Sequence, residues 1–392
     1  MPVYLDHAAT TPMRPEAIAA YTEAMGVVGN PSSIHSQGQQ ARRMLEEARE
    51  TVAATLGADP IEVVFTSGGT EAINLAIKGM FWARNAGAHR PRILVPGGEH
   101  HATMDTVEWL ERAEGAQASW LPLDAEGRIG VPESVAGDDV ALLTFLAVNN
   151  EVGTIQPVRA LAEAARGAGI PVHVDAVAAY GHLPIDFAGL GVDALSVSAH
   201  KIGGPVGIGA LVLSRASTVV PLIHGGGQQR QVRSGTQDVA AAVSFATAAR
   251  LAEAEREAES ARLSALRDRL IRGVRQAVPA AVLSGPEAES GERVASNVHF
   301  TFPGAQGDSL LFLLDMAGVS VSTGSACQAG IPEPSHVLLA MGRGEQEARS
   351  ALRFTLGRTS TEADVDALLA ALPDAYAQAA RAGLAERAPR LS

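Results

Sequence analysis

The sequence predicts an α/β protein with a mainly parallel β-sheet covered by helices, followed by a smaller α+β domain. Three observations support this prediction. Between about residues 40 and 240, short apolar segments alternate with segments of helical periodicity, which is typical of parallel sheets buried on both faces. An alanine-rich, charged helical pattern without proline then covers 240–278 and predicts a connector between domains. Strand and helix patterns in a different order follow it.

The predicted elements of the first part alternate between helix and strand. Helical periodicity with charges on one face predicts a helix over 41–56, and the run Glu62-Val-Val-Phe-Thr66 predicts a strand. The glycine loop Ser67-Gly-Gly-Thr-Glu71 carries a capping residue and an early carboxylate, so a helix over 70–84 is predicted to begin there. Further strands are predicted at 92–95, 140–147, 172–175, 194–197 and 208–213, with helices at 102–112 and 158–168 between them.

The second part is shorter and mixes strands with helices. Strands are predicted at 296–302, 319–322 and 351–355, and a helix at 362–380. The last ten residues are expected to fray.

The composition of the 392-residue chain excludes several classes of protein. A formal net charge of −12 without a basic stripe argues against nucleic-acid binding. The longest strongly apolar run, 140–148, is too short to span a bilayer, and the N-terminus lacks the pattern of a signal peptide. We therefore expect a soluble, cytoplasmic protein. A single cysteine, Cys327, excludes an internal disulfide framework and an all-cysteine metal site within one chain.

One lysine stands at the end of an apolar strand, beside a glycine-rich loop. The strand predicted at 194–197 leads to Lys201, and Gly203, Gly204 and Gly207 follow. Shielding from water lowers the pKa of a lysine and exposes a free amine that forms Schiff bases with aldehydes. The aldehyde of pyridoxal 5'-phosphate is the usual partner. Taken alone, a lysine in this position is more often a surface or capping residue.

Residues that could bind an anion stand at another strand end and directly before Lys201. The loop Ser67-Gly-Gly-Thr-Glu71 offers backbone N–H groups at a helix start, where the helix dipole favours negative charge. Ser198 and His200 could supply further phosphate donors. The loop is equally compatible with an ordinary helix cap. It matches neither a Walker loop nor a dinucleotide fingerprint, so nucleoside phosphates are disfavoured.

Polar residues also follow the remaining strands. Asp175 ends an apolar strand, where it could face a pyridine nitrogen or simply cap a turn. In Glu99-His100-His101 the adjacent histidines suggest a metal site, but no metal-ligand spacing supports one. The alternative is an imidazole that lies flat on a cofactor ring, and we expect His101 to point away. Asn150 follows the strand at 140–147. Ligands gather at the carboxyl ends of parallel strands, so Gly69, Thr70, His100, Asn150, Asp175 and Lys201 are predicted to face one crevice.

The lone cysteine allows two interpretations. A single cysteine is most often a small buried apolar residue. Its neighbours in Ser322-Thr-Gly-Ser-Ala-Cys-Gln-Ala-Gly330 are small and polar, which favours an exposed loop.

Together these residues resemble the cysteine desulfurases of the class V aminotransferase group, over residues 4 to about 369 and in the family's order. The resemblance is carried by Tyr4-Leu-Asp-His-Ala-Ala-Thr-Thr-Pro12, Gly29-Asn-Pro-Ser-Ser33, Phe65-Thr-Ser-Gly-Gly-Thr-Glu71, Val148-Asn-Asn-Glu-Val-Gly153, Ser198-Ala-His-Lys-Ile202, Gly225-Gly-Gly227, Arg233-Ser-Gly-Thr236, Ser325-Ala-Cys327 and Arg353-Phe-Thr-Leu-Gly-Arg358. The Ser-Ala-Cys segment resembles the group whose nucleophile lies on a longer loop.

The resemblance implies fold type I and a role for each site residue. The large domain would hold a mainly parallel seven-stranded sheet. Lys201 would carry pyridoxal 5'-phosphate as a Schiff base and, once freed, move the substrate's α-proton. For the cofactor ring, the resemblance implies that His100 stacks on it, that Asp175 pairs with the pyridine nitrogen and that Asn150 lies near the phenolic oxygen and the substrate. The phosphate would be held by Gly69, Thr70, Ser198 and His200, and by Thr236 of the neighbouring subunit. Arg353, with Asn30 nearby, would bind the substrate's carboxylate, and Cys327 would be the nucleophile that accepts the sulfur.

The resemblance also implies domains and partners. Residues 1–14 would pack with the small domain, 15–255 would form the cofactor domain, and 256–392 the small domain with the cysteine loop at about 321–334. The expected activity converts L-cysteine to alanine and passes sulfur through Cys327 to an acceptor or scaffold protein, as in iron–sulfur cluster assembly or tRNA thiolation. A homodimer is implied. No resident metal and no direct nucleic-acid or membrane binding is expected, although Cys327 could transiently ligate an iron–sulfur cluster.

Two departures from the family pattern bear on the chemistry. The family usually has glutamine at the position of Ala178, and an alanine cannot donate a hydrogen bond to the cofactor's phenolic oxygen. Gln328 and Ala329 replace the Thr-Ser pair common after the cysteine, which leaves the acceptor open.

Three other functions fit part of the pattern. A selenocysteine lyase or another carbon–sulfur lyase would use the same cofactor. A non-catalytic scaffold for iron–sulfur assembly would not need Lys201, Asp175 or His100. An aminotransferase would give no role to Cys327.

Overall fold

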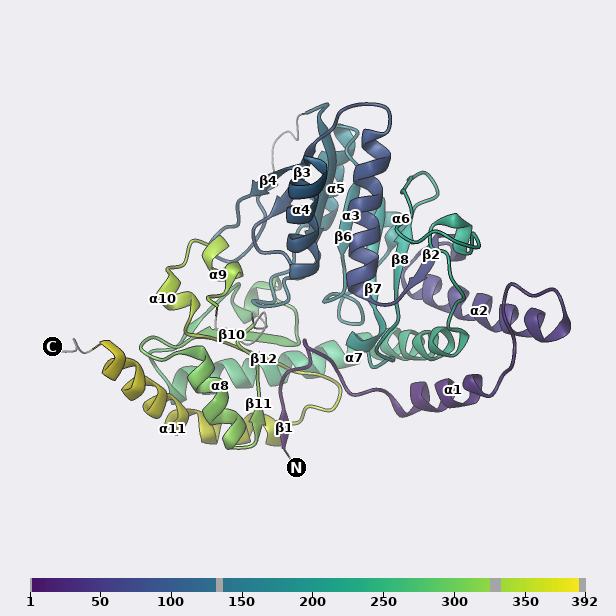
Figure 1. Cartoon of the computed structure of the whole chain (residues 1–392). Coiled ribbons are helices and arrows are strands. Elements are labelled where there is room, and N and C mark those ends of the chain that lie inside the picture. Colours follow the sequence, from purple (N-terminus) through teal and green to yellow (C-terminus); the bar gives the residue numbers. More distant parts are fainter. Residues whose placement is uncertain (1, 132–136, 325–332, 388–392) are drawn as a thin grey trace.

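The computed structural model describes residues 2–131, 137–324 and 333–387, with side chains through residue 382. Its larger part is built on a seven-stranded sheet (Figure 1). The strands lie in the order β2 (Val63–Thr66), β8 (Gly209–Leu213), β7 (Ala194–Ser198), β6 (Val172–Asp175), β5 (Val140–Leu146), β3 (Arg92–Pro96) and β4 (Gln117–Leu121). All neighbours are parallel except those of β8, which runs antiparallel to β2 and β7. The predicted seven-stranded, mainly parallel sheet is confirmed.

Helices cover both faces of this sheet, because its central strands carry apolar side chains on both sides. Every residue of β5, for example, is buried. The helices of this part are α1 (Pro15–Met25), α2 (Ser36–Thr55), α3 (Gly69–Asn85), α4 (His101–Glu114), α5 (Val158–Gly167), the short α6 (Phe187–Leu190) and α7 (Val239–Ala277). One core packs α2, α5 and α7 against the sheet, and α3 and α4 form smaller cores on it.

The smaller part has its own apolar core. It contains β9 (Val282–Leu283), β10 (Asn297–Thr301), β11 (Val319–Ser320), β12 (Ala351–Thr355), α8 (Gly307–Met316), α9 (His336–Ala340), α10 (Glu345–Ala348) and α11 (Glu362–Arg387). Near the N-terminus, β1 (Val3–Tyr4) pairs with β11. Within α7, Ala252 packs in the large core and Leu263 in the small one. The proposed division after residue 255 falls between them.

Several elements differ from the sequence prediction. The helix α1 was not predicted, and α2 begins at Ser36 instead of residue 41. His35 caps the start of α2 by accepting a hydrogen bond from the Gly38 amide. The strands β4 and β9 and the helix α8 were also missed. In β4 this is because it is a sheet edge whose Trp120 is exposed. The last ten residues were expected to fray, but α11 continues to Arg387.

No helix within the described ranges combines the length and apolarity that crossing a lipid bilayer requires.

Candidate active site

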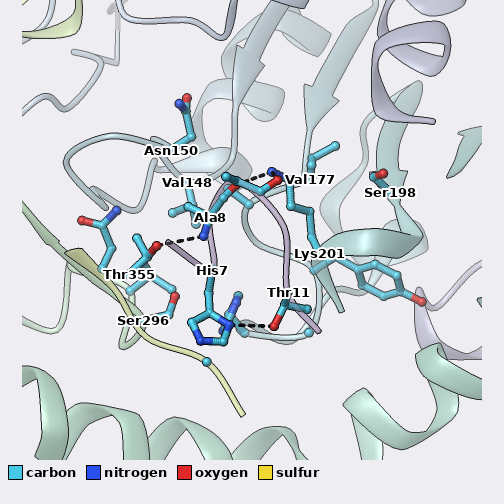
Figure 2. A pocket seen from close by; sticks show the side chains of 18 of the residues that line it. His7, Ala8, Thr11, Val148, Asn150, Val177, Ser198, Lys201, Ser296 and Thr355 are labelled. Atoms are coloured by element: carbon cyan, nitrogen blue, oxygen red, sulfur yellow. Dashed lines mark hydrogen bonds between the residues drawn. The ribbon is translucent and has the colours of Figure 1, made fainter. Parts of the chain in front are cut away.

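A cavity of about 520 Å³ lies at the carboxyl ends of the parallel strands, against β12 of the small domain. Its volume lies within the range of small-molecule sites. Nine of the predicted site residues line it, namely Gly69, Thr70, His100, Asn150, Asp175, Ser198, His200, Lys201 and Arg353. Figure 2 shows how Lys201 and Ser198 approach it from the large domain and Thr355 from the other side. The convergence predicted from the strand ends is therefore present in the fold.

Lys201 ends a 3₁₀ turn, Ala199–Lys201, that directly follows β7. Its Nζ donates hydrogen bonds to the carbonyl oxygens of Ala8 and Ala9 in the N-terminal segment. Burial, helped by the positive charge of Arg353, lowers the pKa of Lys201 to about 8, although nearby carboxylates oppose the shift. A substantial fraction of the amine is therefore neutral near physiological pH, as a nucleophilic lysine requires.

Asp175 is the last residue of β6 and is 2% exposed. Its Oδ1 accepts a hydrogen bond from the Val177 amide at 2.9 Å. Burial raises the pKa of Asp175 to about 6, while the positive charge of Lys201 acts in the opposite direction. A cation placed against this carboxylate, such as a protonated pyridine nitrogen, would stabilise its ionised form and lower its pKa.

The N-terminus of α3 offers an anion site. Its N-cap is Gly68, which has no side chain to satisfy the first-turn N–H groups. Glu71 fixes this turn. Its carboxylate accepts a hydrogen bond from the Ser67 amide at 2.6 Å and pairs with both Nε and Nη2 of Arg233. Ser198 and His200 line the same cavity. Backbone donors and hydroxyl groups at a helix start suit a phosphate.

His100 is fixed as the N-cap of α4. Its Nδ1 accepts the Ala102 amide at 3.0 Å, so the neutral ring carries its proton on Nε2. Burial, with a further contribution from the charge of Lys201, lowers the pKa of His100 to about 4. A neutral imidazole in this position can lie against an aromatic ring. Among the described residues no three histidine, cysteine, aspartate or glutamate side chains form a metal-binding group.

Arg353 reaches the cavity from β12 and is 5% exposed. Its Nη1 donates to the carbonyl of Asn150 and its Nη2 to Oδ1 of Asp6, each at 3.0 Å. Its Nε is buried without a partner among the described residues. The guanidinium thus retains N–H groups that can donate hydrogen bonds to a carboxylate.

These residues fit pyridoxal 5'-phosphate. The cavity combines a weakly basic lysine for an aldehyde, a buried carboxyl for a ring nitrogen, an uncapped helix N-terminus for a phosphate and a neutral imidazole for a ring face. In addition, Oδ1 of Asn150 is buried without a partner in the described structure. Ala178 also lines the cavity, so the alanine that replaces the family's usual glutamine lies within this site.

Gly69 tests this assignment, because a Cβ there would lie 2.9 Å from Cγ2 of Val177. We expect Gly69→Ala to weaken binding of pyridoxal 5'-phosphate about tenfold, because relieving this contact displaces the first turn of α3, whose N–H groups would hold the phosphate. Rearrangements of this size typically cost about 1–3 kcal/mol. Absorbance titration of cofactor-free protein would measure this. Gly87→Ala is the matched control, as its Cβ would meet no atom within 4 Å. Equal affinities for both variants would contradict the proposed cradle.

Two predicted site residues lie away from the cavity, and a third is not among the described residues. Asn30 is exposed between α1 and α2, where its side chain accepts the Ser32 amide, so the expected contact near Arg353 is not made within one chain. Thr236 is exposed before α7 and lines no part of the cavity. Cys327 lies outside the described residues.

Other cavity residues were not assigned a role from the sequence. Contrary to expectation, His101 also lines the cavity, where its ring lies 4.8 Å from that of His336. His336 donates from Nε2 to the carbonyl of Glu99. Glu151 is buried and accepts a hydrogen bond from Ser335. The motif Asn149-Asn-Glu151 contained a signal for Glu151, whereas nothing local indicated His336.

Sequence comparison places the chain among known proteins. The family model Aminotransferase class-V matches residues 3–368. The IscS-like cysteine desulfurase of Mycobacterium tuberculosis is 53% identical over 387 residues, which cover 97% of this chain and 98% of the relative. Cysteine desulfurase IscS of Dictyoglomus turgidum is 42% identical over 368 residues, covering 93% and 92% respectively.

Solved structures agree with this placement. A NifS-like protein superposes with a TM-score of 0.88 at 33% identity, covering 96% of this chain and 100% of the other. SspA in complex with cysteine superposes with a TM-score of 0.77 at 33% identity, covering 90% and 98%. The predicted fold and resemblance are confirmed, and the chain belongs to the cysteine desulfurases of the class V aminotransferase family.

Proposed function

We propose that this enzyme converts L-cysteine to L-alanine and retains the sulfur on Cys327 as a persulfide, with pyridoxal 5'-phosphate as its cofactor. The observation that carries the proposal is the convergence of Lys201, Asp175, Arg353 and the N-terminus of α3 on one cavity. When bound, the cofactor would supply an electron sink that stabilises negative charge at the substrate's α-carbon. Lys201 would hold its aldehyde, Asp175 its pyridine nitrogen and the first turn of α3 its phosphate.

The chain's own residues then position the substrate and move its protons. Arg353 binds the α-carboxylate through its remaining N–H donors. The amine of Lys201, with its pKa near 8, takes the proton from the α-carbon and returns it at a later step. The cavity walls from both domains hold the substrate against these groups. The reacting groups are then already in position, so the reaction proceeds as an effectively unimolecular step.

Sulfur transfer requires the thiolate of Cys327. It attacks the substrate sulfur, so a sulfur–sulfur bond forms as the bond between that sulfur and Cβ breaks. The electron pair left on carbon is protonated, and alanine is released. The persulfide then passes its outer sulfur to an acceptor protein, for which iron–sulfur assembly and tRNA thiolation are the candidates. In the cytoplasmic homodimer that we propose, Thr236 would reach the neighbouring subunit's phosphate.

A single turnover without reductant tests this function. The holoenzyme is mixed with L-cysteine, and we expect one alanine per site and a gain in protein mass of one sulfur atom. The chain contains one cysteine, so peptide mapping assigns that sulfur without ambiguity. Cys327→Ala is the control that cannot retain sulfur. Alanine with free sulfide and an unmodified Cys327 would indicate a lyase, and absence of alanine would indicate another substrate or a scaffold.

A further inference from the structure

The Arg353 guanidinium already has an anionic partner within the chain. Asp6 Oδ1 accepts from Nη2 of Arg353 at 3.0 Å, and the side chain of this aspartate is 20% exposed against 6% for the arginine. The Asn150 carbonyl holds Nη1 from another direction. Asp6 therefore occupies one side of the only group in the proposed mechanism that receives the substrate's carboxylate.

The backbone around Asp6, which lines the cavity, is anchored to neighbouring segments. Asp6 forms a β-bridge with Thr355, and the Thr355 hydroxyl accepts the Ala8 amide at 2.8 Å. Tyr4 donates its hydroxyl to the Asp6 carbonyl at 3.0 Å. Because the backbone is anchored on both sides of it, the Asp6 carboxylate is held beside Arg353 in this structure.

The same segment also contacts Lys201. The carbonyls of Ala8 and Ala9 accept hydrogen bonds from its Nζ, and the charge of Asp6 acts on this amine. Asp6 thus interacts with both cations of the proposed chemistry, Arg353 and Lys201. A substrate's α-carboxylate must share or displace its contact with Arg353, and two carboxylates on one guanidinium repel each other.

We propose that Asp6 is a specificity-determining residue that keeps Arg353 oriented while its charge weakens the binding of the substrate's carboxylate. The consequence is that the monocarboxylate product, alanine, leaves readily, and that amino acids bearing a second negative charge are disfavoured. This inference rests on the proposed function for its substrate, but it concerns any amino acid that binds Arg353.

The test separates charge from orientation. Asp6→Asn removes the charge and keeps an oxygen that can accept from Nη2. In the holoenzyme we expect the Kd for L-alanine, measured by titration calorimetry, to fall about fivefold, as for a partly exposed ion pair, with a parallel fall in KM for L-cysteine. The difference from wild type should shrink at high salt. Asp6→Ala, which lacks the acceptor, should bind alanine less tightly than Asp6→Asn.

Two further variants keep the test decisive. Asp6→Glu retains the charge and should bind alanine no more tightly than wild type, which distinguishes charge from a general loosening of the segment. Asp366→Asn is the matched control, because Asp366 pairs with Arg269 on the surface. An alanine Kd in Asp6→Asn that equals or exceeds that of wild type would overturn the inference. If wild type fails to turn over L-cysteine while Asp6→Asn binds alanine more tightly, the proposed function fails and the role of Asp6 stands.

Discussion

Replacement of Lys201 by alanine is expected to reduce alanine formation from L-cysteine by at least about 10³-fold, because the variant loses both the attachment of the cofactor and the group that moves the α-proton. The position of this amine carries the expectation. It ends the 3₁₀ turn that follows β7, lines the cavity together with Asp175 and Arg353, and has a pKa lowered to about 8 by burial and by Arg353. Steady-state kinetics of the purified holoenzymes would measure the loss.

The chain offers an unusually clean control, since Lys78 is its only other lysine. Lys78 lies 4.3 Å from the ring centroid of Trp109 and lines no part of the cavity. Borohydride reduction of wild type should fix the cofactor permanently to the peptide that contains Lys201. Lys78→Ala should retain activity, and a small primary amine added to Lys201→Ala should restore part of it. Cofactor fixed to Lys78 would contradict the assignment.

The site could be predicted from the sequence where its residues follow apolar strands. Asp175, Lys201 and the loop before α3 each stand at a strand end, and parallel strands bring such ends to one edge. The antiparallel direction of β8 could not be predicted in this way. Its residues are wholly buried like those of its neighbours, and an apolar run gives no information about strand direction.

Contacts between distant segments were the other gap. Arg353 was assigned through resemblance, whereas its pairing with Asp6, 347 residues away in the chain, depends on the bridge between Asp6 and Thr355 of β12. His336 reaches the cavity only because α9 packs near the loop after β3. Such neighbours are set by how the small domain packs on the large one, and no local periodicity encodes them.

Replacement of Asp175 by asparagine is expected to lower activity by about 10²- to 10⁴-fold while stabilising the cofactor-free protein. The loss follows from the role proposed for the carboxylate, because an amide cannot balance a positive charge on the pyridine nitrogen. The amide oxygen can still accept the Val177 hydrogen bond, so the turn after β6 is retained. Kinetics of the holoenzyme would show the loss, and Asp366→Asn, which lies on the surface, should be fully active.

The stabilisation follows from the pKa of Asp175, which burial raises from 3.8 to about 6 in spite of Lys201. A raised carboxyl pKa means that the folded state binds the proton more tightly than the unfolded state, so stability falls as the pH rises from about 4 to about 6 and stays lower above that. Asparagine does not titrate. Near pH 8 the cofactor-free variant should therefore exceed wild type by up to about 3 kcal/mol in free energy of unfolding, and the difference should narrow toward pH 4. Denaturant unfolding at several pH values would measure it, and equal stabilities near pH 8 would show that no penalty is stored there. The buried Asp175 carboxylate thus destabilises the cofactor-free protein, and a bound cation would remove that destabilisation. Such a cost to stability is expected of a residue that is retained for its role in cofactor chemistry.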